Sequence, residues 1–475
     1  MTRENPPSEA EPLRRAPSPT PAVLLRHTRL GLLALVSGLL VGLAAWAFLE
    51  GLAWATRTRL NNETLVWFLP LAGLATGLAY HAYGGRSAEG TGLLLKEIHE
   101  PSAWVPRRLA PMVSVAAVVS HLFGASVGRE GTALQMSGSL TDLVNRTFRV
   151  DREDRRVMLV AALGGGFGAV FGAPWAGLVF GIEVQWVRRI RLRGVIRWLQ
   201  QELRGGFGTP TEPEDLDEED ERLLEPGDDL AEARGFADTG DAPNARLAAA
   251  VLPTLVASFV GAAVVGLLGF HESARPRFTA ALDASLFTGA LATGIAAGVT
   301  ALLFVELTEA VRHRMAHLVA WPPLRPFLGG ILAVALAEIA GRKYLGLSLM
   351  LTDQAFVGHA TTFTIPAWKL LFTAICLGCG YIGGEVTPMF VMGSTLGGAV
   401  AHLIGLDPVI GATLGYAAVF AGAANAPIAC TVMAVEVFGP GVALPAAVAC
   451  FASFVASGRW GVYHRRPERT PTATV

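Results

Sequence analysis

A single acidic residue between two apolar stretches is the first candidate for chemistry in this sequence. Glu130 stands in the run Gly128-Arg129-Glu130-Gly131-Thr132, after the apolar residues 110–128 and before the apolar residues 131–140. A glycine-rich start of a short apolar helix is typical of an anion site, because the unpaired N–H groups and the positive dipole end of a helix bind anions. Glu130 could compete with an anion for that end and leave it when protonated. A helix cap or an ion pair with Arg129 explains the residue equally well, so both readings stay open.

A second loop of the same kind lies in the C-terminal half. It reads Gly383-Gly384-Glu385-Val386-Thr387-Pro388, and Glu385 stands 255 residues after Glu130. Proline is favoured in the first turn of a helix, so this loop also predicts a helix start. Glu385 is therefore a candidate anion or proton relay, with a capping carboxylate as the alternative.

The chain contains an internal repeat. Residues 172–184 (GAPWAGLVFGIEV) and 425–437 (NAPIACTVMAVEV) share Ala-Pro, the next Ala, a Val and the closing Glu-Val, and they are 253 residues apart. The two glycine loops repeat at nearly the same distance. A duplication of this kind is common in transporters, which bind the substrate near the midplane between the two halves. Glu183 and Glu436 close the matching segments and are predicted to sit at the water boundary.

Three further sets of residues have both a chemical and a structural interpretation. Tyr463 could contact an anion through its hydroxyl, but an interfacial aromatic anchor is the default reading. Cys376 and Cys379 form a C-x-x-C spacing that suits a redox or metal role, although small residues also let membrane helices pack closely. Ser126 and His121 suggest an intramembrane serine protease, but residues five apart do not face each other well on one helix.

Composition places the chain in a membrane. Only 16% of the 475 residues are charged and 52% are apolar, whereas soluble domains carry about 25% charged residues. Roughly 20 apolar residues cross the hydrocarbon as a helix. Uncharged runs on that scale occupy residues 31–49, 64–83, 247–270, 284–305, 408–435 and 437–458. Only helices and closed barrels satisfy their own backbone groups in lipid, and these runs lack the alternation of barrel strands, so we predict an all-α polytopic membrane protein.

Charge is distributed unevenly along the chain. Residues 212–241 hold 14 of the 39 acidic residues and two of the 38 basic ones. This pattern predicts a solvated linker, with binding of cations or of a basic partner as the alternative. Arginines cluster before residue 30, after residue 187 and after residue 458, and the positive-inside rule places all three clusters in the cytoplasm.

The predicted organisation follows from these boundaries. It comprises a disordered cytoplasmic N-terminus (1–28), a first membrane repeat (29–200), an acidic cytoplasmic linker (201–245), a second membrane repeat (246–463) and a cytoplasmic tail (464–475).

Together the motifs resemble those of one family, the CLC chloride channels and proton-coupled antiporters. The resemblance rests on Gly-Arg-Glu-Gly, the Ala-Pro repeats and the late Tyr463, and it covers about residues 30–463. It implies the CLC fold of two inverted repeats of broken, tilted helices, assembled as a homodimer with one pore per subunit. It also implies that Glu130 is the gating glutamate, that Tyr463 contacts the central anion, and that backbone amides of the loop at 385–388 face the ion.

Departures from the chloride members resemble the bacterial fluoride/proton antiporters of the same family. This chain has Gly90-Thr91-Gly92-Leu93-Leu94 in place of Gly-Ser-Gly-Ile-Pro, Thr132 in place of a proline, and Val184 in place of an inner proton glutamate. Fluoride is small and strongly hydrated, so it needs strong donors. Hydroxyls and protonated carboxyls are such donors, and Glu385 could take over part of the proton role that Val184 cannot play.

We therefore predict a secondary transporter, not an enzyme. It would be a proton-coupled antiporter that exports fluoride across a bacterial inner membrane, with both termini cytoplasmic. The alternative is a chloride/proton antiporter or an anion channel of the same fold. The predicted partners are fluoride or chloride, protons, membrane lipid and a second copy of the chain; no cofactor, metal or nucleic acid is predicted. The predicted site residues are Glu130 and Glu385 for gating and proton transfer, and Thr91, Gly128, Arg129, Gly131, Val386, Thr387 and Tyr463 for the anion.

Overall fold

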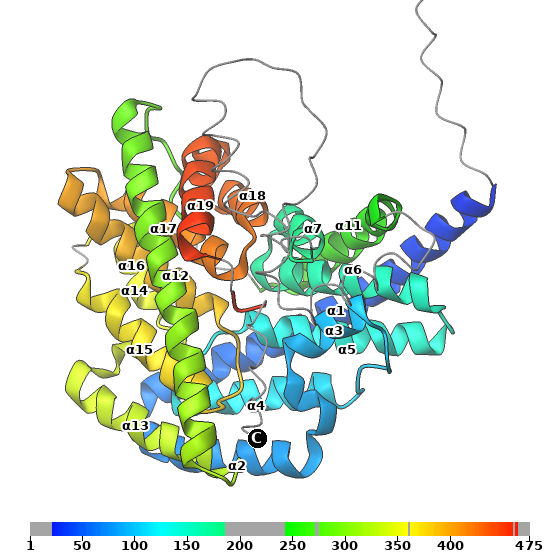
Figure 1. The fold of residues 1–475 in the computed structure, drawn as a ribbon, viewed down its shortest axis with the longest axis horizontal. Coiled ribbons are helices and arrows are strands. Elements are labelled where there is room, and N and C mark those ends of the chain that lie inside the picture. The colour runs from blue at the N-terminus through cyan, green and yellow to red at the C-terminus, as the bar shows by residue number, and fades with distance from the viewer. Residues whose placement is uncertain (1–20, 186–242, 271–274, 360–361, 459–460, 464–475) are drawn as a thin grey trace, which may run out of the picture.

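Helices account for most of the residues that the computed structural model describes, which are 21–185, 243–270, 275–359, 362–458 and 461–463 (Figure 1). The predicted disordered N-terminus up to residue 20, nearly all of the acidic linker and the tail after residue 463 lie outside the described residues. Within the described ranges the backbone forms one isolated bridge, between Gly128 and Gly384, and no strand.

The α-helices fall into two series along the chain. The first series is α1 (Pro21–Asn61), α2 (Leu69–Tyr83), α3 (Thr91–His99), α4 (Leu109–Phe123), α5 (Glu130–Thr147), α6 (Arg152–Phe171), α7 (Pro174–Glu183) and α11 (Pro243–Leu267). The second series is α12 (Ala284–Leu318), α13 (Leu324–Ala340), α14 (Leu349–Phe356), α15 (Thr364–Gly378), α16 (Val386–Ile404), α17 (Pro408–Ala424), α18 (Pro427–Phe438) and α19 (Ala443–Ser457). Short 3₁₀ segments lie at Glu63–Phe68, Gly85–Glu89, Arg342–Tyr344 and Pro440–Val442.

Six helical segments in the described chain are long and apolar enough to cross a membrane. They are Leu25–Asn61, Glu63–Tyr83, Ala249–Leu267, Ala284–Leu318, Val386–Ile404 and Pro440–Ser457. Four other apolar helices, α4, α15, α17 and α18, have 10–17 residues and fall short of the roughly 20 residues that a full crossing needs. The prediction of an all-α polytopic membrane protein is confirmed. The described chain combines helices long enough to cross a membrane with shorter, interrupted ones.

The repeated Ala-Pro motif makes the same break in both halves. Gly172 and Asn425 adopt left-handed backbone conformations (φ 61° and 55°) and end α6 and α17. Left-handed residues commonly end helices, and the proline two residues later begins the next helix, α7 or α18, at a position where no N–H is needed. The uncharged run 408–435 is consequently two helices, not one.

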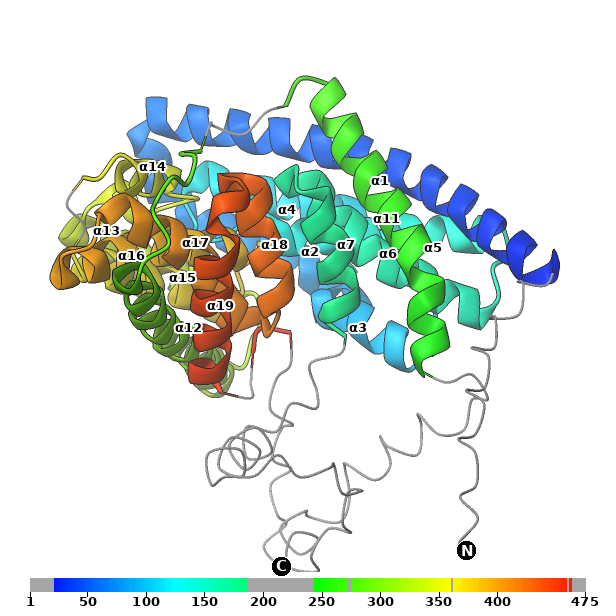
Figure 2. The same ribbon diagram turned by 90° about the horizontal axis from the view of Figure 1, so that it is seen from above.

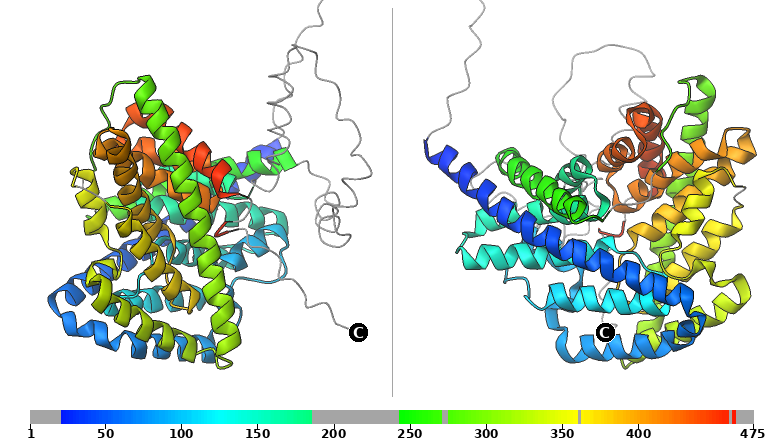
Figure 3. Two further views of the ribbon diagram at one scale, coloured as in Figure 1. Left: turned by 60° about the vertical axis from the view of Figure 1, so that its left-hand side comes forward. Right: turned by 180° about the vertical axis from the view of Figure 1, so that it is seen from behind.

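The two series pack in the same pattern. The helix α1 packs on α4, α5, α6 and α11, and α12 packs on α15, α16, α17 and α19 in the same way. Figure 1 shows α12 across the front of the second half, and the right-hand view of Figure 3 shows α1 across the opposite side of the molecule. The halves are therefore inverted relative to each other, as the resemblance implied. Although α11 follows the linker, it packs on α1, α6 and α7 and so belongs to the first half. The predicted start of the second repeat, at residue 246, differs from this grouping.

A buried ion network fixes the short helix α3. Arg155 donates to Asp142 (Nε to Oδ1, 2.7 Å) and to Glu97 (Nη1 to Oε2, 3.1 Å), and all three side chains are buried. The same carboxylates accept the backbone N–H groups of the loop between α3 and α4, among them that of Val105 at 2.7 Å from Asp142 Oδ2. Satisfied pairs of this kind hold a segment firmly because breaking one partner leaves an uncompensated buried charge. The network therefore holds α3, and with it Thr91, against α5 and α6.

Glycines let α16 and α17 approach within backbone contact. A Cβ on Gly397 would lie 2.0 Å from the Gly411 carbonyl oxygen, and a Cβ on Gly393 would lie 2.1 Å from that of Gly415. Each helix carries its two glycines four residues apart, the small-residue spacing that supports close helix packing in membranes.

We expect Gly397→Ala to lower the thermal unfolding midpoint of the purified protein in detergent. The added methyl meets backbone atoms that cannot rotate away, and such overpacking costs about 1–3 kcal/mol or more. Gly266→Ala is the matched control, because Gly266 also lies in a helix and a Cβ there has no neighbour within 4 Å. Equal midpoints for the two variants would contradict this account of the α16–α17 contact.

Candidate anion site

The two glycine loops meet at the interface between the halves. Gly384 N donates to Gly128 O at 2.7 Å, and Gly128 N donates to Gly384 O in return. A Cβ on Gly384 would lie 2.5 Å from Gly131 N, so no larger residue fits there without displacing the backbone. This antiparallel pair brings the N-termini of α5 and α16 face to face.

Glu130 reaches across this pair to the other half. Its Oε2 accepts Thr387 N (2.9 Å) and Arg129 N (3.1 Å), and its Oε1 accepts Arg129 Nε (3.2 Å) and the Thr387 hydroxyl. The side chain is 1% exposed. The carboxylate thus occupies the N-terminus of α16, the position that suits an anion. The ion pair with Arg129 is present, but the helix that Glu130 caps is the helix of the opposite repeat.

Glu385 has the mirrored position. It is the N-cap residue of α16, and its Oε2 lies 3.4 Å from where a Cβ of Gly131 would stand, at the start of α5. Each acidic residue therefore belongs to one half and faces the helix start of the other. The arrangement can hold negative charge at two adjacent places. It brings together Gly128, Arg129, Glu130, Gly131, Glu385, Val386 and Thr387.

Tyr463 lies beside these carboxylates. Glu385 and Glu130 are close enough to act electrostatically on its hydroxyl, and its ring packs edge-on against Phe180, with the centroids 5.8 Å apart. The Tyr463 hydroxyl and the Thr132 hydroxyl are buried, and neither has a hydrogen-bond partner in the described chain. An unpaired buried donor costs about 1–3 kcal/mol. An anion between the loops and Tyr463 would supply an acceptor.

An aromatic cluster drawn from both halves backs Tyr463. Phe180 stacks on Phe167 (4.4 Å) and on Phe420 (6.0 Å), and Phe420 meets Phe390 edge-on at 5.7 Å. Rings at these separations attract one another beyond simple burial. Through Phe180 the cluster gives the Tyr463 ring an apolar backing, and an apolar environment strengthens charged interactions made within it.

Thr91 lies on another helix and contacts α5 away from the glycine loops. It begins α3, and its hydroxyl receives a 3.4 Å contact from Gln135 Nε2 on α5. Gln135 is five residues after Glu130, about one and a half turns along the helix. Thr91 is therefore tied to the helix of Glu130, and the remaining predicted residues gather at the start of that helix.

Glu183 and Glu436 have a role that the sequence analysis missed. Glu183 Oε1 and Oε2 accept Ile428 N (2.9 Å) and Ala429 N (2.6 Å) at the start of α18, and Glu436 accepts Trp175 N (3.0 Å) and Ala176 N (2.7 Å) at the start of α7. Figure 2 shows α7 and α18 side by side. Glu183 is buried at this contact, and its position relative to the water boundary stays a prediction. The closing Glu-Val of both motifs, at the same distance from Ala-Pro, was the signal for this exchange.

An apolar side chain stands at position 184, where the resemblance to the chloride antiporters leads us to look for a proton glutamate. Val184 directly follows α7 and is buried in the main apolar core. Both carboxylate oxygens of the neighbouring Glu183 accept hydrogen bonds from backbone N–H groups of α18. Proton transfer through this part of the chain would therefore need another group.

The serine protease reading is wrong. His121 Nδ1 contacts Ala117 O at 2.7 Å, whereas Ser126 Oγ contacts Thr373 Oγ1 and receives Lys369 Nζ, each at 2.9 Å. Lys369 was overlooked in the sequence, although one lysine inside an apolar helix is a recognised functional signal. Its Nζ has three further oxygen acceptors, so it is placed as a donor, not as a base.

The two cysteines of the C-x-x-C spacing are free and buried. Cys376 Sγ accepts Ser126 N at 3.3 Å, and Cys379 lies against Gly329. In the described ranges no group of three or more His, Cys, Asp or Glu side chains is arranged to hold a metal ion.

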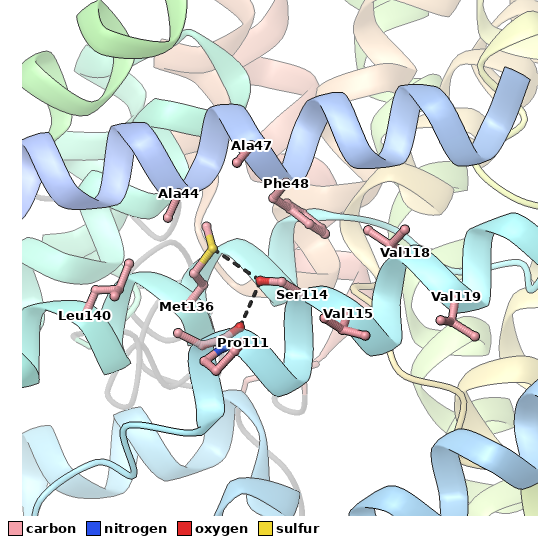
Figure 4. Close-up of a pocket in the computed structure, with 11 residues that line it drawn as sticks. Ala44, Ala47, Phe48, Pro111, Ser114, Val115, Val118, Val119, Met136 and Leu140 are labelled. Atoms are coloured by element: carbon pink, nitrogen blue, oxygen red, sulfur yellow. Dashed lines mark hydrogen bonds between the residues drawn. The ribbon is translucent and has the colours of Figure 1, made fainter.

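One cavity in the described part of the chain lies away from the loops. It is a groove of about 490 Å³ between α1, α4 and α5, lined by residues such as Phe48, Val115 and Met136 (Figure 4). Its one hydroxyl, on Ser114, is bonded to Ala110 O at 2.8 Å. The groove offers an anion no free donor, so the loops remain the candidate site.

The fold and the site define a class: a membrane protein of two inverted halves whose broken helices meet around buried carboxylates. The family model described as voltage gated chloride channel matches residues 72–201 and 246–458. A "chloride/fluoride channel protein" of Pseudomonas syringae pv. tomato is 39% identical over 91% of this chain and 85% of its own length. The chain therefore belongs to the voltage-gated chloride channel (CLC) family of channels and transporters.

More distant relatives share the whole membrane part. An "H(+)/Cl(-) exchange transporter ClcA" of Vibrio cholerae is 25% identical over 85% of this chain and 81% of its own. A crystal structure described as a CLC-type fluoride/proton antiporter superimposes with a TM-score of 0.77, at 26% identity, over 94% of this chain and 100% of that chain. A slow cyanobacterial Cl⁻/H⁺ antiporter has the same fold, with a TM-score of 0.69 at 19% identity over 92% and 96% of the two chains.

We expect Glu183→Gln to lower the thermal unfolding midpoint by weakening the contact between α7 and α18. The amide keeps one acceptor but loses the charge that complements the helix dipole, a loss of up to about 2 kcal/mol in a partly buried place. Glu50→Gln is the control, since Glu50 is an exposed carboxylate on α1. The account would be contradicted by a Glu183→Gln midpoint equal to that of Glu50→Gln.

Proposed function

We propose that this protein exchanges fluoride for protons and exports fluoride from the cytoplasm. The observation that carries the proposal is the place of Glu130, whose carboxylate lies on the N-terminus of α16 and accepts Thr387 N at 2.9 Å. Helix N-termini bind anions, so a deprotonated Glu130 blocks the place that a transported anion needs. Protonation removes the negative charge and frees that helix end, which couples the anion to a proton.

Three features favour fluoride over chloride. The Thr387 hydroxyl donates to the Glu130 carboxylate, and the buried hydroxyls of Thr132 and Tyr463 have no partner within the described residues. A small, strongly hydrated ion gains most from such donors, because it gives up the most hydration on entering the protein. The Pseudomonas relative is named for chloride and fluoride, and the structure with a TM-score of 0.77 is described as a fluoride/proton antiporter.

Glu385 is the proposed second proton carrier. Its carboxylate faces the start of α5, near Tyr463, and the position that holds an inner glutamate in chloride antiporters is Val184. A carboxyl group accepts a proton and can then donate a hydrogen bond to an anion. Glu385 would therefore pass a proton between Glu130 and the cytoplasmic side of the site while fluoride moves in the opposite direction.

The proposal includes the setting of the transporter. The positive-inside rule supports cytoplasmic termini, and the bacterial sources of the relatives support exchange across a bacterial inner membrane. Family resemblance supports a homodimer with one transport path in each subunit. Chloride/proton exchange is the second candidate, and the observation that favours it is the 25% identity with the Vibrio transporter over 85% of the chain. An anion channel is the third, since the Pseudomonas relative is named a channel.

Flux measurements in liposomes test the proposal directly. We expect the wild type to release fluoride at least about tenfold faster than chloride, equivalent to about 1.4 kcal/mol of discrimination. A proton gradient should drive fluoride uphill. We expect Glu130→Gln, which cannot titrate, to lose this proton-driven transport, whereas Glu338→Gln, at an exposed carboxylate on α13, should retain it. Undiminished proton coupling in Glu130→Gln would overturn the assignment of the gate, and faster chloride release would favour the second candidate.

We expect Glu385→Gln to reduce proton flux while fluoride still binds. The amide keeps a donor and an acceptor in place but cannot carry a proton. The measurement is the ratio of protons to fluoride ions exchanged by proteoliposomes, with fluoride binding to the detergent-purified variant recorded in parallel. An unchanged ratio would remove Glu385 from the proton route and leave Glu130 unaffected.

A further inference from the structure

Three basic side chains are buried together beside the loop that leads to Glu130. They are Arg59 at the end of α1, His121 at the end of α4 and Lys369 in α15, with exposed fractions of 7%, 1% and 0%. His121 interacts electrostatically with both of the others, and Lys369 interacts with Arg59. The three helices that carry them meet around the backbone of residues 124–126 and 344–348.

The contacts of Lys369 solvate its charge without neutralising it. Its ammonium donates to Ser126 Oγ (2.9 Å), Tyr344 O (3.1 Å), Gly346 O (2.7 Å) and Ser348 Oγ (2.9 Å). All four acceptors are uncharged. Ser126 lies four residues before Glu130, so the positive charge of Lys369 is attached to the loop that carries the gate.

Arg59 holds a donor that nothing in the described chain satisfies. The Arg59 side chain lies against Gly124 and Gly346, with Nη2 2.9 Å from where a Cβ of Gly346 would stand. Its Nε is buried and has no hydrogen-bond partner among the described residues. His121 Nδ1 donates its proton to Ala117 O, so Nε2 of the neutral ring is an acceptor.

Negative charge is missing from this basic cluster of Arg59, His121 and Lys369. Within the described chain no carboxylate forms an ion pair with any of the three, and the groups that act on Lys369 are Cys376 and Arg59. Removing a charge from water without a partner costs several kcal/mol. An ionisable side chain inside a membrane protein therefore suggests a binding role.

We infer that the basic cluster is a second anion site, distinct from the place occupied by Glu130. A small inorganic anion of the halide type would accept from Arg59 Nε, and its charge would balance those of Arg59 and Lys369. The site goes beyond the proposed function. Only the choice of fluoride as its natural ion rests on that function. It is connected to the gate through the loop 124–129, so an anion held there stands next to the transport path.

Equilibrium binding tests the inference without relying on transport. Fluoride and chloride are each titrated into the full-length protein in detergent, and the number of anions bound per subunit is measured by calorimetry. We expect Arg59→Met to bind one anion fewer than the wild type. Arg57→Met is the matched control, because Arg57 is an exposed arginine two residues earlier on α1, and it should bind as many anions as the wild type.

Arg59→Lys provides a second variant that keeps the charge and removes the Nε donor. We expect it to weaken the same binding event about tenfold, since one hydrogen bond to a charged ligand is lost. Equal stoichiometry and affinity in wild type, Arg59→Met and Arg59→Lys would overturn the inference and leave the cluster as a structural support. Because both anions are titrated, a protein that transports chloride instead of fluoride would still reveal the site.

Discussion

Two helix N-termini that face each other are the constraint on which the rest of the structure depends. The reciprocal bonds between Gly128 and Gly384 bring the starts of α5 and α16 together, and both starts carry positive dipole ends. Such ends repel each other in an apolar interior unless negative charge lies between them. Glu130, on α5, supplies that charge to α16, and Glu385, before α16, faces α5. A carboxylate and an anion are therefore alternatives for one electrostatic requirement, which is the physical basis for exchange.

The rest of the fold repeats the same solution at a second place. Glu183 caps α18 and Glu436 caps α7, each from the opposite half. Because the halves are inverted, the end of one helix lies at the start of its counterpart, and a single sequence motif serves both. Glycines such as Gly397 allow the helices behind the site to touch through their backbones. The loops are held in place by the close packing of the broken helices and by carboxylates that each cap a helix of the opposite half. The site between the loops stays polar.

Charge balance also connects the site with its surroundings. The carboxylates lie between the loops, and the basic cluster of Arg59, His121 and Lys369 lies behind the loop that precedes Glu130. Both kinds of charge therefore meet the same loop, Lys369 at Ser126 and the carboxylate at Glu130. The proposed fluoride ion would find hydrogen-bond donors in the unpaired hydroxyls of Thr132 and Tyr463.

The sequence alone determined the membrane class, the duplication and the residues of the two loops, because these depend on composition and local motifs: Glu130 and Glu385 are identified by their glycines, and the breaks before α7 and α18 by Ala-Pro. Only the tertiary structure decided which partner each residue meets. Glu130 caps α16 and not its own helix, Glu183 caps α18 of the opposite half, and α11 packs with the first half. The basic cluster likewise joins residues 59, 121 and 369, which no local pattern relates. The physical reason is that burial and pairing arise from contacts between segments some 250 residues apart, whereas sequence patterns report on the few residues of one turn.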